Sequence, residues 1–297
     1  MRRFAPAAVA AILLAAGSLG ALAAPLTDAR GRTVEIADRS RVVSIGGTVT
    51  EILYALGVEA AIAAVDTTSL YPPAAMQDHP NVGYMRALSA EGVLSTGATL
   101  ILASEAAGPP EVTDLLAGSS VPMVFVDDTP TPEAVTGRIR FLAAAMGVPE
   151  RGAALAAKVD DGFARLAAAR AEVKTPAKVL FVLAMRDGHP MVAGRGTAAD
   201  AIIGLAGATN IAAGFEGYKA MGDEAIVEAQ PDVVLMMQNG DHKPDAGMLD
   251  TAAFAATPAG RDKRLVAMDG QSLLGFGPRT PAVALELVRT LHPGQLP

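Results

Sequence analysis

Residues 149–173 read PERGAALAAKVDDGFARLAAARAEV, a run that is rich in alanine and charged residues and has no proline after its first position. Its larger apolar side chains recur at helical spacing, at Leu155, Val159, Phe163 and Leu166. About 25 residues at 1.5 Å each would form a helix of roughly 38 Å. A helix of that length can run from one domain to another, and Thr175-Pro176 is expected to end it.

On both sides of this helix, short apolar runs alternate with segments of helical pattern. Strands are expected at residues 41–45, 60–65, 99–103 and 122–126 before it, and at 178–183, 232–236 and 264–268 after it. Helices are expected at residues 48–56, 91–95 and 111–116, and at 197–205, 223–228 and 281–291. Strands that alternate with helices predict parallel sheets covered by helices. Thr48 and Glu51 have the spacing of a capping box at the first of these helices.

The two halves of the chain repeat one another. Residues 91–102 (EGVLSTGATLIL) align without gaps with residues 224–235 (EAIVEAQPDVVL), and a glutamate, Glu91 or Glu224, opens each copy. We therefore expect an α/β fold of two similar lobes, each a mostly parallel sheet flanked by helices. One long rigid helix joins the lobes, and the ligand cleft lies between them. The expected boundaries are 24–148 for the N-terminal lobe, 149–175 for the connecting helix and 176–297 for the C-terminal lobe.

Residues 1–23 have the pattern of a secretory signal peptide. Arg2-Arg3 precede the apolar run from Ala7 to Leu14, and Ala21-Leu22-Ala23 offers a small-x-small cleavage site. No cysteine follows this segment, so a lipid anchor is not expected. We expect an exported, periplasmic protein that is cleaved near Ala23 and begins near Ala24.

Composition narrows the possible functions. The net charge of −7 argues against a nucleic-acid partner, and the absence of cysteine excludes thiolate metal sites and a cysteine nucleophile. The four histidines are scattered and do not suggest a zinc site. Gly194-Arg195-Gly196-Thr197 matches the start of a dinucleotide fingerprint, but a lone glycine pattern is weak evidence. The start of the helix that follows would also suit a carboxylate or phosphate.

One loop, Gly83-Tyr-Met-Arg-Ala-Leu-Ser-Ala-Glu-Gly92, carries a rarer chemical signal. Tyr84 is one of only 4 tyrosines, and Arg86 stands two residues after it. A nearby positive charge favours the phenolate form of a phenol. A phenolate suits ferric iron, and tyrosine is a known axial ligand of haem iron. From these residues alone, a surface tyrosine stacked on its neighbouring arginine is the competing interpretation.

Other candidates for the ligand site are aromatic or cationic side chains on expected loops or next to helix starts: Tyr71, His189, Arg195, Tyr218, Phe276 and Arg279. Tyr71 could line the cleft with its ring or pack on Pro72. His189 could face the cleft from the second lobe or be an exposed turn residue. Phe276 could supply an apolar wall, and Arg279 could pair with a propionate or simply favour solubility.

The loop Val82-Gly-Tyr-Met-Arg-Ala-Leu-Ser-Ala-Glu-Gly92 resembles the ligand loop of periplasmic haem-binding proteins of bacterial haem ABC importers. Gly217-Tyr218-Lys219, the pair Asp223-Glu224 and the segment LGFGPR at 274–279 also resemble that family. The likeness spans nearly the whole mature chain. The broader class is the cobalamin- and siderophore-type substrate-binding proteins, in which a single long helix joins two α/β lobes.

The resemblance implies that Tyr84 is the axial ligand of ferric haem (ferric protoporphyrin IX) and that Arg86 holds its oxygen as phenolate. It also implies that Glu91 and Glu224, one on each lobe, dock on arginines of an inner-membrane haem ABC permease, which works with an ATPase. An outer-membrane haem receptor system would act upstream. Some family members use a histidine of the second lobe or hold two stacked haems, and His189 is the counterpart here.

The expected function is therefore capture of ferric haem and its delivery to the permease, without enzyme activity. A ferric-siderophore or corrinoid binding protein of the same class is the first alternative. An exported, nucleotide-dependent oxidoreductase that uses the Gly194 loop is an alternative of another class.

Overall fold

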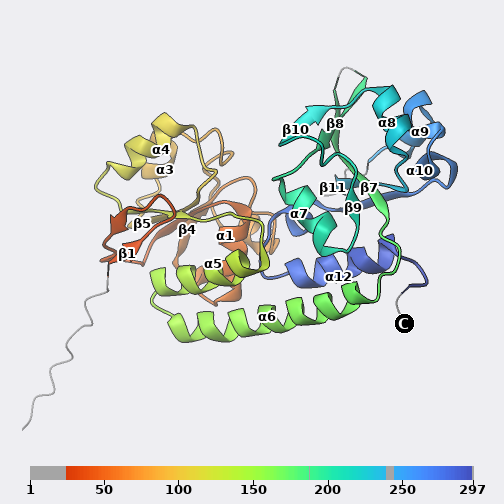
Figure 1. Ribbon diagram of the computed structural model, residues 1–297. Coiled ribbons are helices and arrows are strands. Elements are labelled where there is room, and N and C mark those ends of the chain that lie inside the picture. Colours follow the sequence, from red (N-terminus) through yellow and green to blue (C-terminus); the bar gives the residue numbers. More distant parts are fainter. Residues whose placement is uncertain (1–24, 187, 239–243, 296–297) are drawn as a thin grey trace, which may run out of the picture.

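The computed structural model describes residues 25–186, 188–238 and 244–295, so the expected signal peptide lies outside the described residues. The described chain forms two lobes that stand side by side on one long helix, α6 (Figure 1). None of the helices within these ranges is long and apolar enough to cross a membrane.

The sheet of the N-terminal lobe is entirely parallel. Its strands follow the order β4-β3-β5-β6. They are β3 (Val42–Ile45), β4 (Ile62–Val65), β5 (Leu100–Ser104) and β6 (Met123–Val126). Nearly every residue of these strands is buried. Continuous apolar runs of this kind are what a sheet needs when helices cover both of its faces.

Helices cover the two faces of this sheet unequally. Apolar residues of α1 (Gly47–Ala55), α5 (Pro132–Ala145) and α6 (Pro149–Ala171) share one core cluster with the sheet. Residues of α3 (Ala90–Leu94) and α4 (Pro110–Ala117) pack on the other face. The lobe also contains β1 (Leu26–Thr27), β2 (Thr33–Val34), η1 (Glu59–Ala61) and α2 (Ala74–Asp78).

The C-terminal lobe contains the same parallel unit with an addition. Its strands β7 (Lys178–Arg186), β9 (Thr209–Asn210), β11 (Val233–Gln238) and β12 (Leu265–Asp269) pair in parallel, in the order β9-β7-β11-β12. In addition, β8 (His189–Ala193) pairs antiparallel with β7, and β10 (Tyr218–Ala220) pairs antiparallel with β8. The expected similarity of the lobes is confirmed, but the second sheet is mixed because of these two strands.

The helices of this lobe are α7 (Ala198–Leu205), α8 (Asp223–Ala229), η2 (Ala246–Asp250), α9 (Ala252–Ala255), α10 (Pro258–Arg261), α11 (Gly270–Leu274) and α12 (Thr280–Leu291). The repeat found in the sequence corresponds to equivalent elements. In each copy a short helix, α3 or α8, leads into a strand, β5 or β11, that has parallel neighbours on both sides.

The connecting helix α6 has 23 residues, which at 1.5 Å per residue makes about 35 Å. It runs along the lower edge of both lobes in Figure 1 and packs against α5 and α12. Two glycines permit this close packing. A Cβ at Gly152 would lie 2.2 Å from the Cβ of Ala143, and one at Gly162 would lie 2.9 Å from Pro281.

Two differences from the expected fold affect residues at the cleft. Helix α5 was not expected from the sequence, although Thr131 caps it and Pro132 opens it. The capping box predicted from Thr48 and Glu51 is wrong, because Gly46 is the N-cap of α1 and no side chain caps it. Both side chains instead bond to the segment between α11 and α12.

His292 should make the stability of the fold depend on pH. It is 1% exposed, and its Nε2 lies 3.1 Å from the carbonyl oxygen of Ala206. Burial lowers the pKa of His292, so the unfolded chain takes up its proton at a higher pH than the folded chain does. The contribution of His292 to stability is therefore full at neutral pH and is lost as the pH falls below the ordinary histidine value.

We expect the free energy of unfolding to fall less between about pH 7.5 and pH 5.5 in His292→Gln than in the wild type. Urea unfolding at the two pH values measures this difference. Parallel losses in the two proteins would show that His292 is not the group responsible.

Candidate functional site

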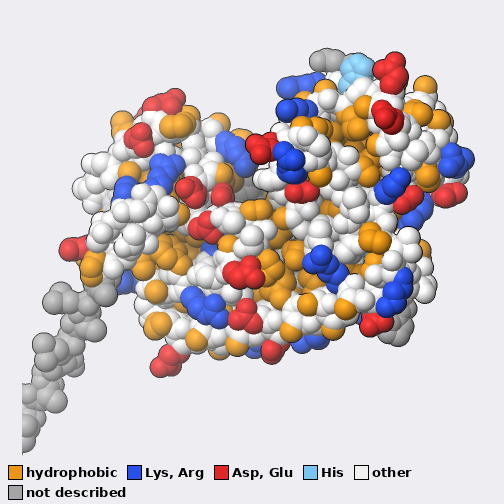
Figure 2. Space-filling model, in the orientation of Figure 1, with side chains coloured by type: hydrophobic (Ala, Val, Ile, Leu, Met, Phe, Trp, Pro, Cys, Tyr) orange, Lys and Arg blue, Asp and Glu red, His pale blue; other side chains and the backbone are white. Residues whose placement is uncertain are grey.

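A cleft of about 650 Å³ lies between the two lobes, whose outline dips between them in Figure 2. From the N-terminal lobe it is lined by residues 46–49, Met85, Arg86, Ser104, Ala106, residues 126–130 and Arg138. From the C-terminal side it is lined by residues 196–198, Gly217, Tyr218, Leu274 and Gly275. Several of these segments follow the carboxyl ends of β3, β5 and β6, where open α/β sheets bind their ligands.

Arg86 lines this cleft and pairs with Tyr84, which is not itself among the lining residues. They belong to a turn in which the amide of Ala87 donates to the carbonyl oxygen of Tyr84 at 2.8 Å. Met85, between them, is 7% exposed and anchors the turn in the core of the lobe, whereas Tyr84 remains 44% exposed. Nη1 of Arg86 donates to the phenolic oxygen of Tyr84 at 2.8 Å. The structure therefore brings together the two side chains on which the iron-ligand hypothesis depends.

Tyr218 lies across the cleft from this pair. It is the first residue of β10, and its backbone pairs with Ala193 of β8. Burial raises the pKa of the Tyr218 phenol, while the positive charge of Arg86 and a hydrogen bond with Thr197 act in the opposite direction. The charge of Arg86 is therefore close enough to act on groups of both lobes.

Arg279 does not offer a free positive charge. Its Nε and Nη2 donate to the two carboxylate oxygens of Glu51 at 3.0 and 2.9 Å, and Glu51 is 5% exposed. Its guanidinium carbon lies 3.6 Å from the centre of the Tyr71 ring. Burial opposes the charge of Arg279, but the hydrogen bonds to Glu51 and the negative charges around the guanidinium together outweigh burial and raise the pKa of Arg279. Tyr71 and Arg279, both expected at the ligand, thus contact each other.

Phe276 does not line the cleft, contrary to the sequence analysis. Its backbone has a φ of 50°, and its side chain is 1% exposed and packs in the core. Its carbonyl oxygen accepts a hydrogen bond from Nη1 of Arg138 at 2.8 Å. The neighbouring Leu274 and Gly275 line the cleft instead.

His189 and Arg195 lie outside the residues that line the cleft. Both side chains are 56% exposed. Nδ1 of His189 lies 4.0 Å from a carboxylate oxygen of Asp223, and Nη2 of Arg195 lies 3.9 Å from Glu216. The glycine pattern around Arg195 has a packing reason, since a Cβ at Gly194 would lie 2.3 Å from the carbonyl oxygen of Phe215.

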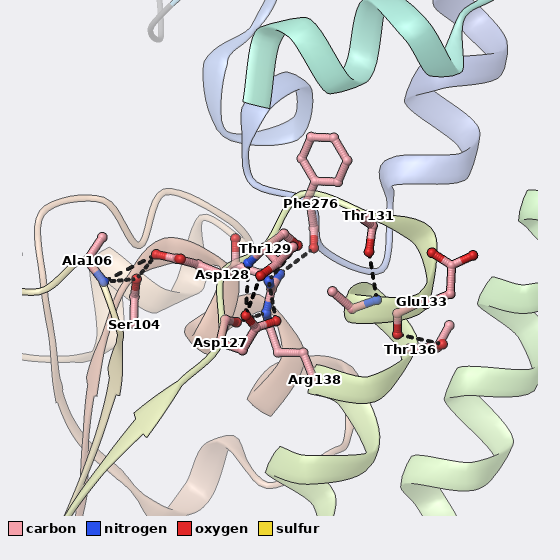
Figure 3. Close-up of polar contacts among 12 residues, drawn as sticks. Ser104, Ala106, Asp127, Asp128, Thr129, Thr131, Glu133, Thr136, Arg138 and Phe276 are labelled. Atoms are coloured by element: carbon pink, nitrogen blue, oxygen red, sulfur yellow. Dashed lines mark hydrogen bonds and ion pairs between the residues drawn. The ribbon is translucent and has the colours of Figure 1, made fainter. Parts of the chain in front are cut away.

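A polar cluster that was not expected from the sequence lies on the N-terminal side of the cleft (Figure 3). Arg138, on α5, is 4% exposed and donates to the carbonyl oxygens of Asp127, Thr129 and Phe276. Burial lowers the pKa of Arg138, although Asp127 and Asp128 act against this. Arg138 therefore joins the loop after β6 to the segment between α11 and α12. The sequence signal that could have placed Arg138 on a helix is Thr131-Pro132, which marks the start of α5.

Glu91 and Glu224 occupy equivalent places on the two lobes. Each is exposed in the first turn of its helix, α3 or α8. Both helices lie on the upper side of the molecule in Figure 1, opposite α6. Within the described ranges, no group of three or more His, Asp or Glu residues could hold a metal ion.

Two α/β lobes joined by one long helix, with a cleft between them, define a bilobal substrate-binding protein. Residues 42–272 match the periplasmic binding protein family, and the chain belongs to that family.

Similar proteins of known structure include the periplasmic heme-binding protein RhuT from Roseiflexus sp. RS-1 in apo form. It is 38% identical with a TM-score of 0.82, over 87% of this chain and 100% of that one. The periplasmic heme-binding protein BhuT, in complex with two hemes, is 41% identical with a TM-score of 0.79, over 86% of this chain and 98% of that one. An uncharacterized ABC transporter substrate-binding lipoprotein, YvrC of Bacillus subtilis (strain 168), is 24% identical over 90% of this chain and 85% of its own length.

The pairing of Glu51 with Arg279 should matter for stability. Arg279→Met leaves the buried Glu51 carboxylate without its partner, and we expect the free energy of unfolding to fall by about 3 kcal/mol. Urea unfolding measures the loss, and adding Glu51→Gln to the same chain should recover part of it. A loss below about 0.5 kcal/mol, as for an exposed ion pair, would contradict this expectation.

Proposed function

We propose that this protein captures ferric haem in the cleft between its lobes, with Tyr84 as axial ligand, and delivers it to an inner-membrane ABC permease. The hydrogen bond from Arg86 to the phenolic oxygen of Tyr84 carries the proposal. A guanidinium that donates to this oxygen stabilises the negative charge that the oxygen bears when it binds ferric iron. Tyrosine is an established haem ligand, and Tyr84 is exposed enough for a flat ligand to reach it.

The shape and lining of the cleft also suit haem. Its volume of about 650 Å³ lies in the range typical of cofactor pockets. Ala106, Pro130 and Leu274 line the cleft, are partly exposed and supply apolar surface for a porphyrin. The 38% and 41% identical structures are both described as heme-binding proteins.

Groups of both lobes complete the proposed site. Tyr218 faces the ligand from the C-terminal lobe, and the exposed Arg195, next to the cleft residue Gly196, is a candidate partner for a haem propionate. Tyr71 contributes at the rim through the ring that stacks on Arg279. His189 is a candidate for contact with a second haem, because it is exposed on β8 of the same lobe.

Delivery would use the face that carries Glu91 and Glu224. One exposed carboxylate on each lobe can pair with arginines of the permease, whose ATPase drives import. In this scheme haem enters the periplasm through an outer-membrane receptor system, and the protein itself performs no catalysis. The signal peptide directs export and is cleaved near Ala23.

The axial ligand can be tested with Tyr84→Phe, which removes the oxygen and keeps the ring. We expect the ferric-tyrosinate absorption signature to disappear and the haem affinity to fall by about tenfold or more. An absorption titration with hemin measures both, and also the stoichiometry. Tyr54→Phe is the matched control, because Tyr54 lies on α1 with its hydroxyl at 3.1 Å from His79. A wild-type spectrum in Tyr84→Phe would refute the assignment.

The docking face can be tested separately from haem binding. The double variant Glu91→Ala/Glu224→Ala should bind haem normally but transfer it more slowly to the permease, because two charges of the contact are lost. Transfer is measured with the permease in proteoliposomes. Glu150→Ala/Glu172→Ala removes two exposed carboxylates at the ends of α6, on the other side of the molecule, and serves as the control. Equal transfer rates in the two double variants would contradict the proposal.

A further inference from the structure

A fully buried carboxylate lies directly behind the N-terminal wall of the cleft. Asp66 follows β4 and is 0% exposed. One of its oxygens accepts from the amide of Gly46 at 2.8 Å and from the hydroxyl of Ser69 at 3.0 Å. The other accepts from the amide of Thr68 at 2.9 Å and from its hydroxyl at 2.8 Å. These four donors replace the water that an ionised carboxylate would otherwise bind.

Three buried hydroxyl groups continue this network. Ser44, Thr50 and Ser69 are all 0% exposed, and their oxygens follow one another at 2.7 Å. Ser69 has one hydroxyl proton and donates it to Asp66, so it can only accept from Thr50, which in turn accepts from Ser44. Each hydroxyl group of this series therefore donates in the direction of Asp66. The network requires an acceptor at that position and has no place for a further donor.

The network holds the first turn of α1, which lines the cleft. Gly46 has a φ of 110° and donates to Asp66. The amide of Gly47 donates to the Thr68 hydroxyl oxygen at 2.9 Å, and a Cβ at this position would lie 2.2 Å from the carbonyl oxygen of Thr68. The loop around Asp66 and the start of α1 thus fit against each other with no free space.

The same loop holds the turn that carries Tyr84. The amide of Thr67 donates to the carbonyl oxygen of Gly83 at 2.9 Å, one residue before Tyr84. The hydroxyl oxygen of Thr68 lies 3.8 Å from Sδ of Met85, the buried anchor of the turn.

We propose that Asp66 is a positioning residue for the bound ligand: its carboxylate fixes the Tyr84 oxygen relative to the cleft wall formed by the start of α1. This inference rests on the proposed function, in which Tyr84 binds haem iron. In Asp66→Asn an amide group with two N–H donors replaces one carboxylate oxygen, opposite groups that are themselves donors. The loop must then move, and the turn of Tyr84 moves with it.

The experiment compares Asp66→Asn with Asp28→Asn. Asp28 is a buried carboxylate of the same lobe, 5% exposed, that accepts from the amides of Arg30, Arg32 and Phe125 and is not among the residues that line the cleft between the lobes. Both variants are loaded with hemin under conditions in which urea unfolding shows them to be folded. The ferric-tyrosinate absorption and electron paramagnetic resonance spectra are recorded, and haem loss to an excess of apomyoglobin is followed.

We expect Asp66→Asn to shift the tyrosinate spectra and to release haem about tenfold faster than the wild type, whereas Asp28→Asn keeps the wild-type spectra and rate. Thr68→Val removes the hydroxyl that bridges Asp66 and Gly47, and should cause a smaller change in the same direction. It decides the question if Asp66→Asn does not fold.

Wild-type spectra and release rates in Asp66→Asn, or in Thr68→Val where that variant decides, would overturn the inference. So would equal changes in Asp66→Asn and Asp28→Asn, which would reveal a general loss of stability. Failure of the proposed function is recognised separately, because Tyr84→Phe then keeps the wild-type spectrum. If Tyr84→Phe loses the tyrosinate signature and the Asp66 variant does not change it, only the inference fails.

Discussion

The geometry of the cleft depends on a second attachment between the lobes, in addition to α6. The segment from Gln271 to Arg279 leaves the C-terminal lobe and bonds to the N-terminal lobe at several points. Its end is held by the bidentate pair of Arg279 with Glu51. Its middle is held by bonds from Thr48 to Gly275 and from Arg138 to Phe276, and its start by a bond from Gln271 to Gly47. Because the helix and this segment both connect the lobes, a simple hinge about α6 would break buried hydrogen bonds.

This attachment also uses some of the positive charges near the cleft, so that they are paired within the protein. Arg279 and Arg138 are cations near the cleft, but both are already paired within the protein. Arg279 donates to a carboxylate, and Arg138 donates to three carbonyl oxygens. Arg86 instead donates to a phenol that is itself exposed. The positive charge that faces the cleft is thereby concentrated beside Tyr84.

Much of the architecture could be predicted from local sequence. The continuous apolar runs predicted the parallel strands. The helical spacing of Leu155, Val159 and Leu166 predicted the face of α6 that packs on the core, where Val159 and Leu166 are buried and Leu155 is partly buried. The predictions that were wrong concern residues whose partners lie far away in the sequence. Glu51 has the spacing of a capping residue, but Arg279, 228 residues later in the chain, binds it instead.

The candidate site could be predicted where its residues are close together in the sequence. Tyr84 and Arg86 are two residues apart, so their pairing could be proposed directly. Phe276 is buried in a core cluster whose other members come from distant parts of the chain, and no local pattern reveals this. The network of Asp66 joins ordinary polar residues of separate segments, which only the strand register brings into contact.

The antiparallel strands β8 and β10 affect how the cleft can vary among related proteins. The four parallel strands of each lobe form equivalent units, but β8 and β10 occur in the C-terminal lobe alone among the described strands. Tyr218 is carried by this edge addition and not by the duplicated unit. The strand β10 lies at the edge of its sheet and pairs only with β8, so its side chains can change while the parallel strands keep their pairing. Exchanging the residues of β10 between related proteins would therefore alter one wall of the cleft and keep the scaffold that supports it.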